Sequence, residues 1–203
     1  MPDQGGAGPG VFKHGNFYFD ADGNMFANDG TSSRYWHEYM IASLTANPGA
    51  SGAALVPPSA NTLGGYALSN AAHLLAFQVH IESDWDGISD PILEVDFCVN
   101  VDNTLGAAED TADLKLQVWY KGEGETVNKT QEIEVPTVVG ASARYKQFEA
   151  VFTLNHAAVD NIIEAGDNFG MLLNLETDSS EVDNVIITMI EFKYKTTKPA
   201  EEI

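Results

Sequence analysis

The feature that most constrains this chain is an alternation of apolar and polar residues that recurs along most of its length. Side chains two positions apart lie on the same face of a β-strand, so each run predicts a strand with one buried face. Turn-rich segments separate the runs, which favours an all-β fold, an antiparallel sandwich of two sheets. The apolar positions are Leu75, Phe77, Val79 and Ile81; Leu93, Val95, Phe97, Val99 and Val101; Leu114, Leu116, Val118 and Tyr120; Ile133 and Val135; Phe148, Ala150, Phe152 and Leu154; Phe169, Met171, Leu173 and Leu175; and Ile186, Thr188, Ile190, Phe192 and Tyr194.

The chain divides into four predicted parts. Residues 1–10, rich in Gly and Pro, are expected to form a flexible N-terminal arm. Residues 11–62 are expected to be an N-terminal hairpin and loop region that anchors or oligomerises the protein, with the hairpin turn at Asp20 to Asn24. Residues 63–197 are expected to be the β-sandwich domain, and residues 198–203 a C-terminal tail.

Two segments have a helical pattern. Residues 34–44, RYWHEYMIASL, fit a strand or a short helix by periodicity, and we favour the strand. Residues 155–166 predict one short helix, because Asn155 can cap its start and Gly166 can end it.

Composition limits the possible partners. The 203 residues include 10 Lys and Arg against 30 Asp and Glu, a formal net charge of -20. A surface that binds a phosphate backbone or an anionic membrane needs clustered cations, so we expect neither nucleic acid nor membrane as a partner. No run approaches the roughly 20 apolar residues of a membrane helix, and we expect a soluble protein made in a cytoplasm. The single cysteine, Cys98, is expected to be a small buried hydrophobe.

Residues 83–90, SDWDGISD, place three acids, a glycine and a tryptophan between two predicted strands. We interpret them as a structural turn. Asp84 and Asp86 can accept hydrogen bonds from a tight turn, Gly87 supplies a positive φ, and Trp85 can pack across the open end of the sandwich.

The segment from Gly65 to Lys195 resembles a β-sandwich domain found among tailed-phage and related viral structural proteins. The matching features are the corner Asp84 to Gly87, the LKLQVWYKGEGE segment at 114–125, the EAGDNFGMLLNL step at 164–175 and the closing DNVIITMIEFKYK at 183–195. The family usually has an arginine- and aspartate-containing run after the Gly-Asp strand, whereas this chain has ETDSSEVDN at 176–184.

The resemblance implies a jelly-roll-like sandwich in a capsid-decoration, head-fibre or tail-associated protein, commonly a homotrimer. It implies no catalysis. We therefore expect a viral structural protein on the exterior of a virion, made in the host cytoplasm. Its expected partners are copies of itself and other virion proteins such as the major capsid protein.

Catalytic and metal sites have weak support in the sequence. Asp84, Asp86 and Asp90 are neighbours in sequence, whereas a glycosidase needs two carboxyls that face each other across a cleft, so we predict no enzyme. Asp20, Asp22 and Asn24 could begin a calcium loop, but Gly23 comes two positions early and Thr31 stands where a bidentate Glu is needed. The five histidines have no ligand spacing, and no cofactor is expected.

The N-terminal aromatic residues are the remaining candidates. Core, inter-subunit contact and ligand contact all stay open for them, and we take them as interface candidates: Phe17, Phe19, Tyr35, Trp36 and Tyr39. An alternative function is a glycan-binding one, as a carbohydrate-binding module or the receptor-binding head of a fibre. That alternative predicts exposed, coplanar rings among Tyr35, Trp36, Trp85 and Trp119.

Overall fold

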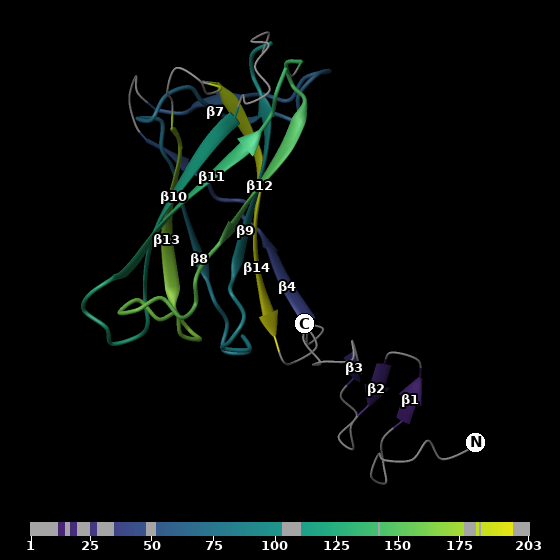
Figure 1. The fold of residues 1–203 in the computed structure, drawn as a ribbon, viewed down its shortest axis with the longest axis vertical. Coiled ribbons are helices and arrows are strands. Elements are labelled where there is room, and N and C mark those ends of the chain that lie inside the picture. Colours follow the sequence, from purple (N-terminus) through teal and green to yellow (C-terminus); the bar gives the residue numbers. More distant parts are fainter. Residues whose placement is uncertain are drawn as a thin grey trace.

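The computed structural model describes residues 35–47, 52–102, 111–141, 143–176, 182 and 184–196, and the backbone of three short strands between residues 12 and 27 (Figure 1). The strands are β1 (Phe12–His14), β2 (Phe17–Phe19), β3 (Met25–Ala27), β4 (Tyr35–Met40), β5 (Thr45–Ala46), β6 (Ala54–Val56), β7 (Gly65–Leu68), β8 (Leu75–His80), β9 (Ile92–Val99), β10 (Thr111–Lys121), β11 (Lys129–Val138), β12 (Gln147–Thr153), β13 (Asn168–Glu176) and β14 (Val185–Thr196).

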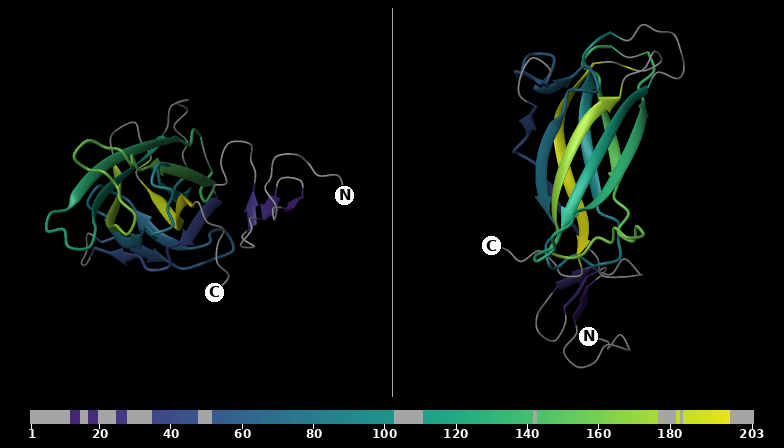
Figure 2. Two further views of the ribbon diagram at one scale, coloured as in Figure 1. Left: turned by 90° about the horizontal axis from the view of Figure 1, so that it is seen from below. Right: turned by 90° about the vertical axis from the view of Figure 1, so that its left-hand side faces the viewer.

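Two antiparallel sheets form the body of the molecule. A five-stranded sheet has the order β11-β10-β13-β8-β5, and a six-stranded sheet has the order β12-β9-β14-β7-β6, with β4 also paired to β14. Seen from one end, the sheets face each other as two layers (Figure 2, left). The predicted all-β sandwich is therefore confirmed. None of the described residues forms a helix that could span a membrane.

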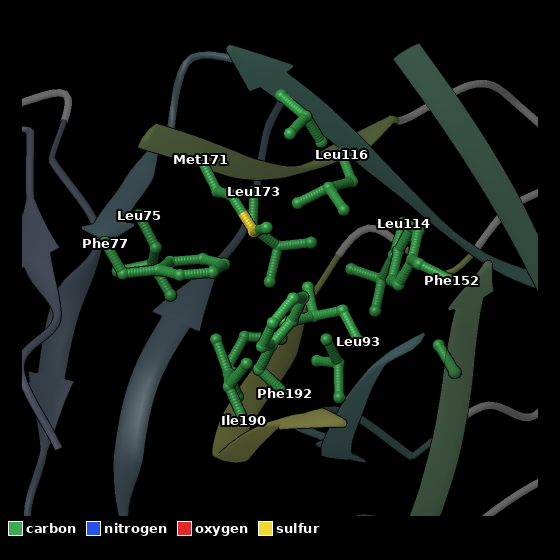
Figure 3. Close-up of a cluster of buried hydrophobic side chains, with 14 of the residues drawn as sticks. Leu75, Phe77, Leu93, Leu114, Leu116, Phe152, Met171, Leu173, Ile190 and Phe192 are labelled. Atoms are coloured by element: carbon green, nitrogen blue, oxygen red, sulfur yellow. The ribbon is translucent and has the colours of Figure 1, made fainter. Parts of the chain in front are cut away.

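The core lies between the two sheets and consists of the alternating apolar residues. Phe77, Met171 and Leu173 of the five-stranded sheet point toward Leu93 and Phe192 of the six-stranded sheet (Figure 3). Each fully buried side chain of this kind contributes about 1.5–3 kcal/mol to folding by leaving water. Because inward residues alternate with outward ones, this core also fixes which side chains face solvent on the outer face of each sheet.

The predicted alternation in β14 is wrong at its start. A β-bulge between Ile187 and Met189 shifts the register, so Val185 and Ile187 enter the core, whereas Ile186 faces the other side. Ile186 packs there with Ala67 and Cys98 in a second, smaller cluster. Cys98 is buried as expected, and burial raises the pKa of its thiol. Alternation from sequence cannot locate a bulge, because the inserted residue belongs to the pairing between strands.

The sandwich begins N-terminal to residue 63. The strand favoured for residues 34–44 appears as β4, which pairs with β14, while β5 pairs with β8 and β6 pairs with β7. Strands β1 to β3, drawn in purple in Figure 1, form their own antiparallel sheet. The predicted turn Asp20 to Asn24 lies between β2 and β3, outside the described residues.

The short helix predicted at 155–166 is replaced by turns. The Asn155 side chain accepts a hydrogen bond from the Ala157 N–H at 3.0 Å, and Asp160 has a φ of 63°. Asn and Asp side chains compete with a helix for backbone groups, and a left-handed residue cannot continue one. These turns bury Ile163 against the core.

Candidate ligand-binding groove

The corner Asp84 to Gly87 is a closed, hydrogen-bonded turn. One carboxylate oxygen of Asp86 accepts from the N–H groups of Ile88 (3.0 Å) and Ser89 (2.8 Å), and Gly87 has a φ of 71°. Trp85 is 6% exposed, and its indole N–H donates to the Ser89 carbonyl at 3.1 Å. The acids of this corner therefore hold backbone and side-chain donors in place.

Asp84 and Asp90 bind partners that are distant in sequence. Asp84 accepts from the hydroxyls of Tyr194 (3.1 Å) and Thr196 (3.0 Å). Asp90 lies 2.7 Å from the ring nitrogen Nδ1 of His156 and accepts from its backbone N–H. Burial would raise the pKa of Asp90, but these bonds to His156 hold it below the usual range. Asp84 thus ties the corner to β14, and Asp90 ties the start of β9 to the turns after β12.

The candidate aromatic residues do not form one platform. Trp85 is buried, Trp36 is 46% exposed on β4 of the six-stranded sheet, and Trp119 is half-buried on β10 of the five-stranded sheet. The Tyr39 hydroxyl lies 3.0 Å from that of Tyr194. The side chains of Phe17, Phe19 and Tyr35 lie outside the described part of the structure.

The calcium candidate Asp20, Asp22 and Asn24 also falls outside the described residues. Within the ranges that are described, no three His, Cys, Asp or Glu side chains are grouped so that they could hold a metal ion.

A groove of about 770 Å³ crosses the outer face of the five-stranded sheet. Its floor runs from β10 across β13 to β8, and the segment leading into β5 forms one side. None of the described residues that line it is ionisable. The lining consists of Ser43, Thr45, Ala76, Phe77, Gln78, Trp119, Gly170, Met171 and Leu172.

Strand register explains how this floor is assembled. Trp119 lies opposite Gly170, and Gly170 lies opposite Gln78, so the three form a row across adjacent strands. Each faces outward because its neighbours in sequence face the core: Val118 and Tyr120 on β10, for example, are buried. Along this row, the ring of Trp119 is followed by the bare backbone of Gly170 and then by the amide of Gln78.

The charged side chains on this face lie beside the groove and are not part of its lining. Lys115 precedes Trp119 by four residues and lies on the same face of β10. Its ammonium group lies 2.9 Å from a carboxylate oxygen of Glu132, 3.3 Å from one of Glu134 and 3.7 Å from one of Glu176. The hydrogen bond to Glu132 is the largest cause that raises the pKa of Lys115 to about 12. Its positive charge is therefore directed to carboxylates on the neighbouring strands.

The groove continues on the other side of the Trp119 row. A second hollow of about 430 Å³ shares Gln78, Trp119 and Gly170 with the first and adds polar residues at the sheet end. These include Asn128, Asn168 and the exposed Lys121. A ligand longer than one small ring could therefore lie across the row and contact both hollows.

Sequence reasoning identified Trp119 but not its partners in the groove. Gln78 and Gly170 stand at outward positions of predicted strands, and a glycine inside a strand can indicate close approach of a ligand. Thr45 and Ser43 carry no such signal, because they fall in a segment whose path follows from tertiary pairing of β5 with β8.

Comparison with known proteins adds little to this geometry. No family model and no curated protein matches the chain. Solved structures that match include a xylan-binding module CBM15, which is 10% identical, covers 79% of this chain and 97% of that chain, and has a TM-score of 0.46. At this TM-score, the likeness carries no functional inference.

Proposed function

We propose that this protein binds a neutral carbohydrate in the groove on the outer face of its five-stranded sheet, without catalysis. The observation that carries the proposal is an uncharged groove of about 770 Å³ in a chain whose net charge is -20. Ligand sites combine apolar and aromatic lining with a few placed polar groups, and this groove has both.

The lining suits the surfaces of a sugar. The C–H bonds on one face of a pyranose ring are apolar and can pack on the face of the Trp119 indole. The hydroxyls around the ring edge need donors and acceptors, which the Gln78 amide and the hydroxyls of Ser43 and Thr45 supply. The lining has no cationic side chain that could pair with the carboxylate of a uronic acid, so we expect neutral glycans to be preferred.

Replacing Trp119 tests this proposal. We expect Trp119→Ala to weaken binding of soluble neutral oligosaccharides at least about tenfold, because the loss of a stacked aromatic contact together with its buried apolar area costs about 1.4 kcal/mol or more. Isothermal titration with cellohexaose, xylohexaose and mannohexaose measures the affinity per chain.

Trp36→Ala is the matched control, since it removes an exposed tryptophan from the opposite sheet and should leave the affinity unchanged. The proposal fails if the unaltered protein binds none of these hexasaccharides. It also fails if Trp36→Ala rather than Trp119→Ala abolishes binding.

A role in a viral particle remains a second proposal. Trp36 (46% exposed) and Met40 (67% exposed) stand on β4, which suits a subunit contact and supports assembly into an oligomer such as a homotrimer. In that setting, glycan binding would be the task of a receptor-binding head on the particle exterior.

We also infer a jelly-roll connection of the last eight strands. The orders β7-β14-β9-β12 and β8-β13-β10-β11 support it, since the chain changes sheet at each step from β7 to β14 except within the β10–β11 hairpin.

A further inference from the structure

Gly170 has no evident role in the fold. It lies in β13, which pairs with β10 on one side and β8 on the other, so it is in the interior of the sheet. Its φ is outside the left-handed region, and a Cβ built there would have no atom within 4 Å apart from its chain neighbours. Neither conformation nor packing therefore requires glycine at this position.

Neighbouring side chains do not cover Gly170 either. An aromatic ring on the adjacent strand can compensate for a glycine by packing over it. Trp119 stands directly opposite, yet neither its ring nor the Gln78 side chain reaches the Cβ position. The result is a bare patch of backbone between an indole and an amide, at the point that both hollows share.

A glycine at such a position destabilises the strand, and all it provides is open space above the backbone. Glycine is disfavoured in strand interiors, because it loses more conformational freedom on folding and packs no side chain. Where a glycine has no structural reason, close approach of a ligand to the backbone is the explanation that fits an open groove.

We propose that Gly170 is the ligand-contact position that determines which glycans the groove accepts. One ring of a neutral glycan lies flat on the backbone of Gly170, with Trp119 and Gln78 on either side. That ring must be unbranched, because branches project in the plane of the ring, where Trp119 and Gln78 flank it. This inference rests on the carbohydrate-binding function proposed above and adds the class of glycan.

The test is to fill the patch in the full-length protein. Gly170→Ala adds one carbon at a position where a Cβ meets no other atom within 4 Å, and Gly170→Val adds two more carbons on the same outward face. We expect both to keep or raise the thermal unfolding midpoint, by about 1–4 °C. We expect Gly170→Val to weaken binding of the best of cellohexaose, xylohexaose and mannohexaose at least about tenfold, and Gly170→Ala less. Thr153→Val, exposed on β12 of the other sheet, is the control and should change neither quantity.

Branched probes test the stated class. Xyloglucan, arabinoxylan and galactomannan oligosaccharides carry side chains on the same three backbones, and we expect the branched form of the best binder to bind more weakly than the unbranched one. Equal binding of the two forms would contradict the claim that the ring on Gly170 is unbranched.

The remaining outcomes separate this inference from the proposed function. If Trp119→Ala abolishes binding but Gly170→Val binds like the unaltered protein, the role of Gly170 is overturned and the proposed function stands. A lowered unfolding midpoint in both Gly170 variants would also overturn that role, because the fold would then require the glycine. If no hexasaccharide binds the unaltered protein, the proposed function itself fails.

Discussion

At the end of the five-stranded sheet, the ammonium group of Lys129 lies 3.1 Å from a carboxylate oxygen of Asp167, whose side chain is fully buried. The same ammonium group lies 3.1 Å from Glu164 and 3.4 Å from Glu125. Burial alone would lower the pKa of Lys129, but hydrogen bonds to Asp167 and Glu164 raise it. This cluster joins two loops next to the hollow that contains Asn128 and Lys121.

Removing the positive charge of Lys129 should destabilise the folded protein. We expect Lys129→Met to lower the free energy of unfolding by about 3–5 kcal/mol, because it leaves the buried carboxylate of Asp167 without its cation. Urea denaturation at neutral pH measures the change. Lys121→Met removes an exposed lysine nearby and should stay within about 0.5 kcal/mol. Equal effects of the two substitutions would show that the Lys129 cluster is solvated.

Single residues were predictable where their partners are close in sequence. The turn roles of Asp86 and Gly87 follow from SDWDG alone, because their partners Ile88 and Ser89 come directly after them. The bonds from Asp84 to Tyr194 and Thr196 span 110 and 112 residues, and only the pairing of strands brings those groups together.

At the scale of elements, three neighbouring strands bring acids together on the outer face of the six-stranded sheet. Glu149 of β12 lies opposite Asp96 of β9, and Glu94 of β9 lies opposite Glu191 of β14. The ammonium group of Lys193 lies 2.5 Å from a carboxylate oxygen of Glu94 and balances part of this negative charge. Burial, followed by the nearby carboxylate of Glu94, raises the pKa of Glu149.

A raised carboxyl pKa in the folded state means that folding favours the protonated form. The contribution of Glu149 to stability therefore falls as pH rises through its folded-state pKa. We expect Glu149→Gln to increase the free energy of unfolding at pH 7 and to have a smaller effect near pH 4, where the carboxyl is largely protonated. Denaturant titration at both pH values checks this. A loss of stability at pH 7 would contradict it.

Strands were predictable from alternation, whereas the helix prediction was wrong because side chains there compete for the backbone hydrogen-bonding groups. Most strands followed from period-two patterning. The helix expected at 155–166 failed because Asn155 and Asn161 use their side chains to accept from backbone N–H groups, those of Ala157 and Thr130. The second of these bonds crosses to β11 and is invisible in local sequence.

Oligomeric assembly is a property of the whole molecule, and it can be tested independently of the groove. We expect the full chain to be a trimer by light scattering, and a form lacking residues 1–34 to keep both the sandwich and the trimer, because β4, which carries the exposed Trp36 and Met40, begins at Tyr35. A monomeric full chain would remove the support for a virion building block while leaving the groove intact.

The groove shows how far sequence can go toward a site. Alternation places Trp119, Gln78 and Gly170 on outward faces, but it does not place them side by side. Their neighbourhood comes from the registers of β10 with β13 and of β13 with β8, which join residues about 50 and 90 positions apart. Sequence could therefore nominate the residues of the site, whereas only the fold could assemble them.

The most direct test of the central claim uses the three tryptophans as reporters. Their indole N–H signals can be resolved by ¹H–¹⁵N NMR and assigned with Trp→Phe variants during titration with the neutral hexasaccharides. Trp119 lies in the groove, Trp36 on the opposite sheet and Trp85 in the closed corner. We predict that only the Trp119 signal shifts, saturably. Shifts confined to Trp36, or no shift with any hexasaccharide, would contradict carbohydrate binding at this face.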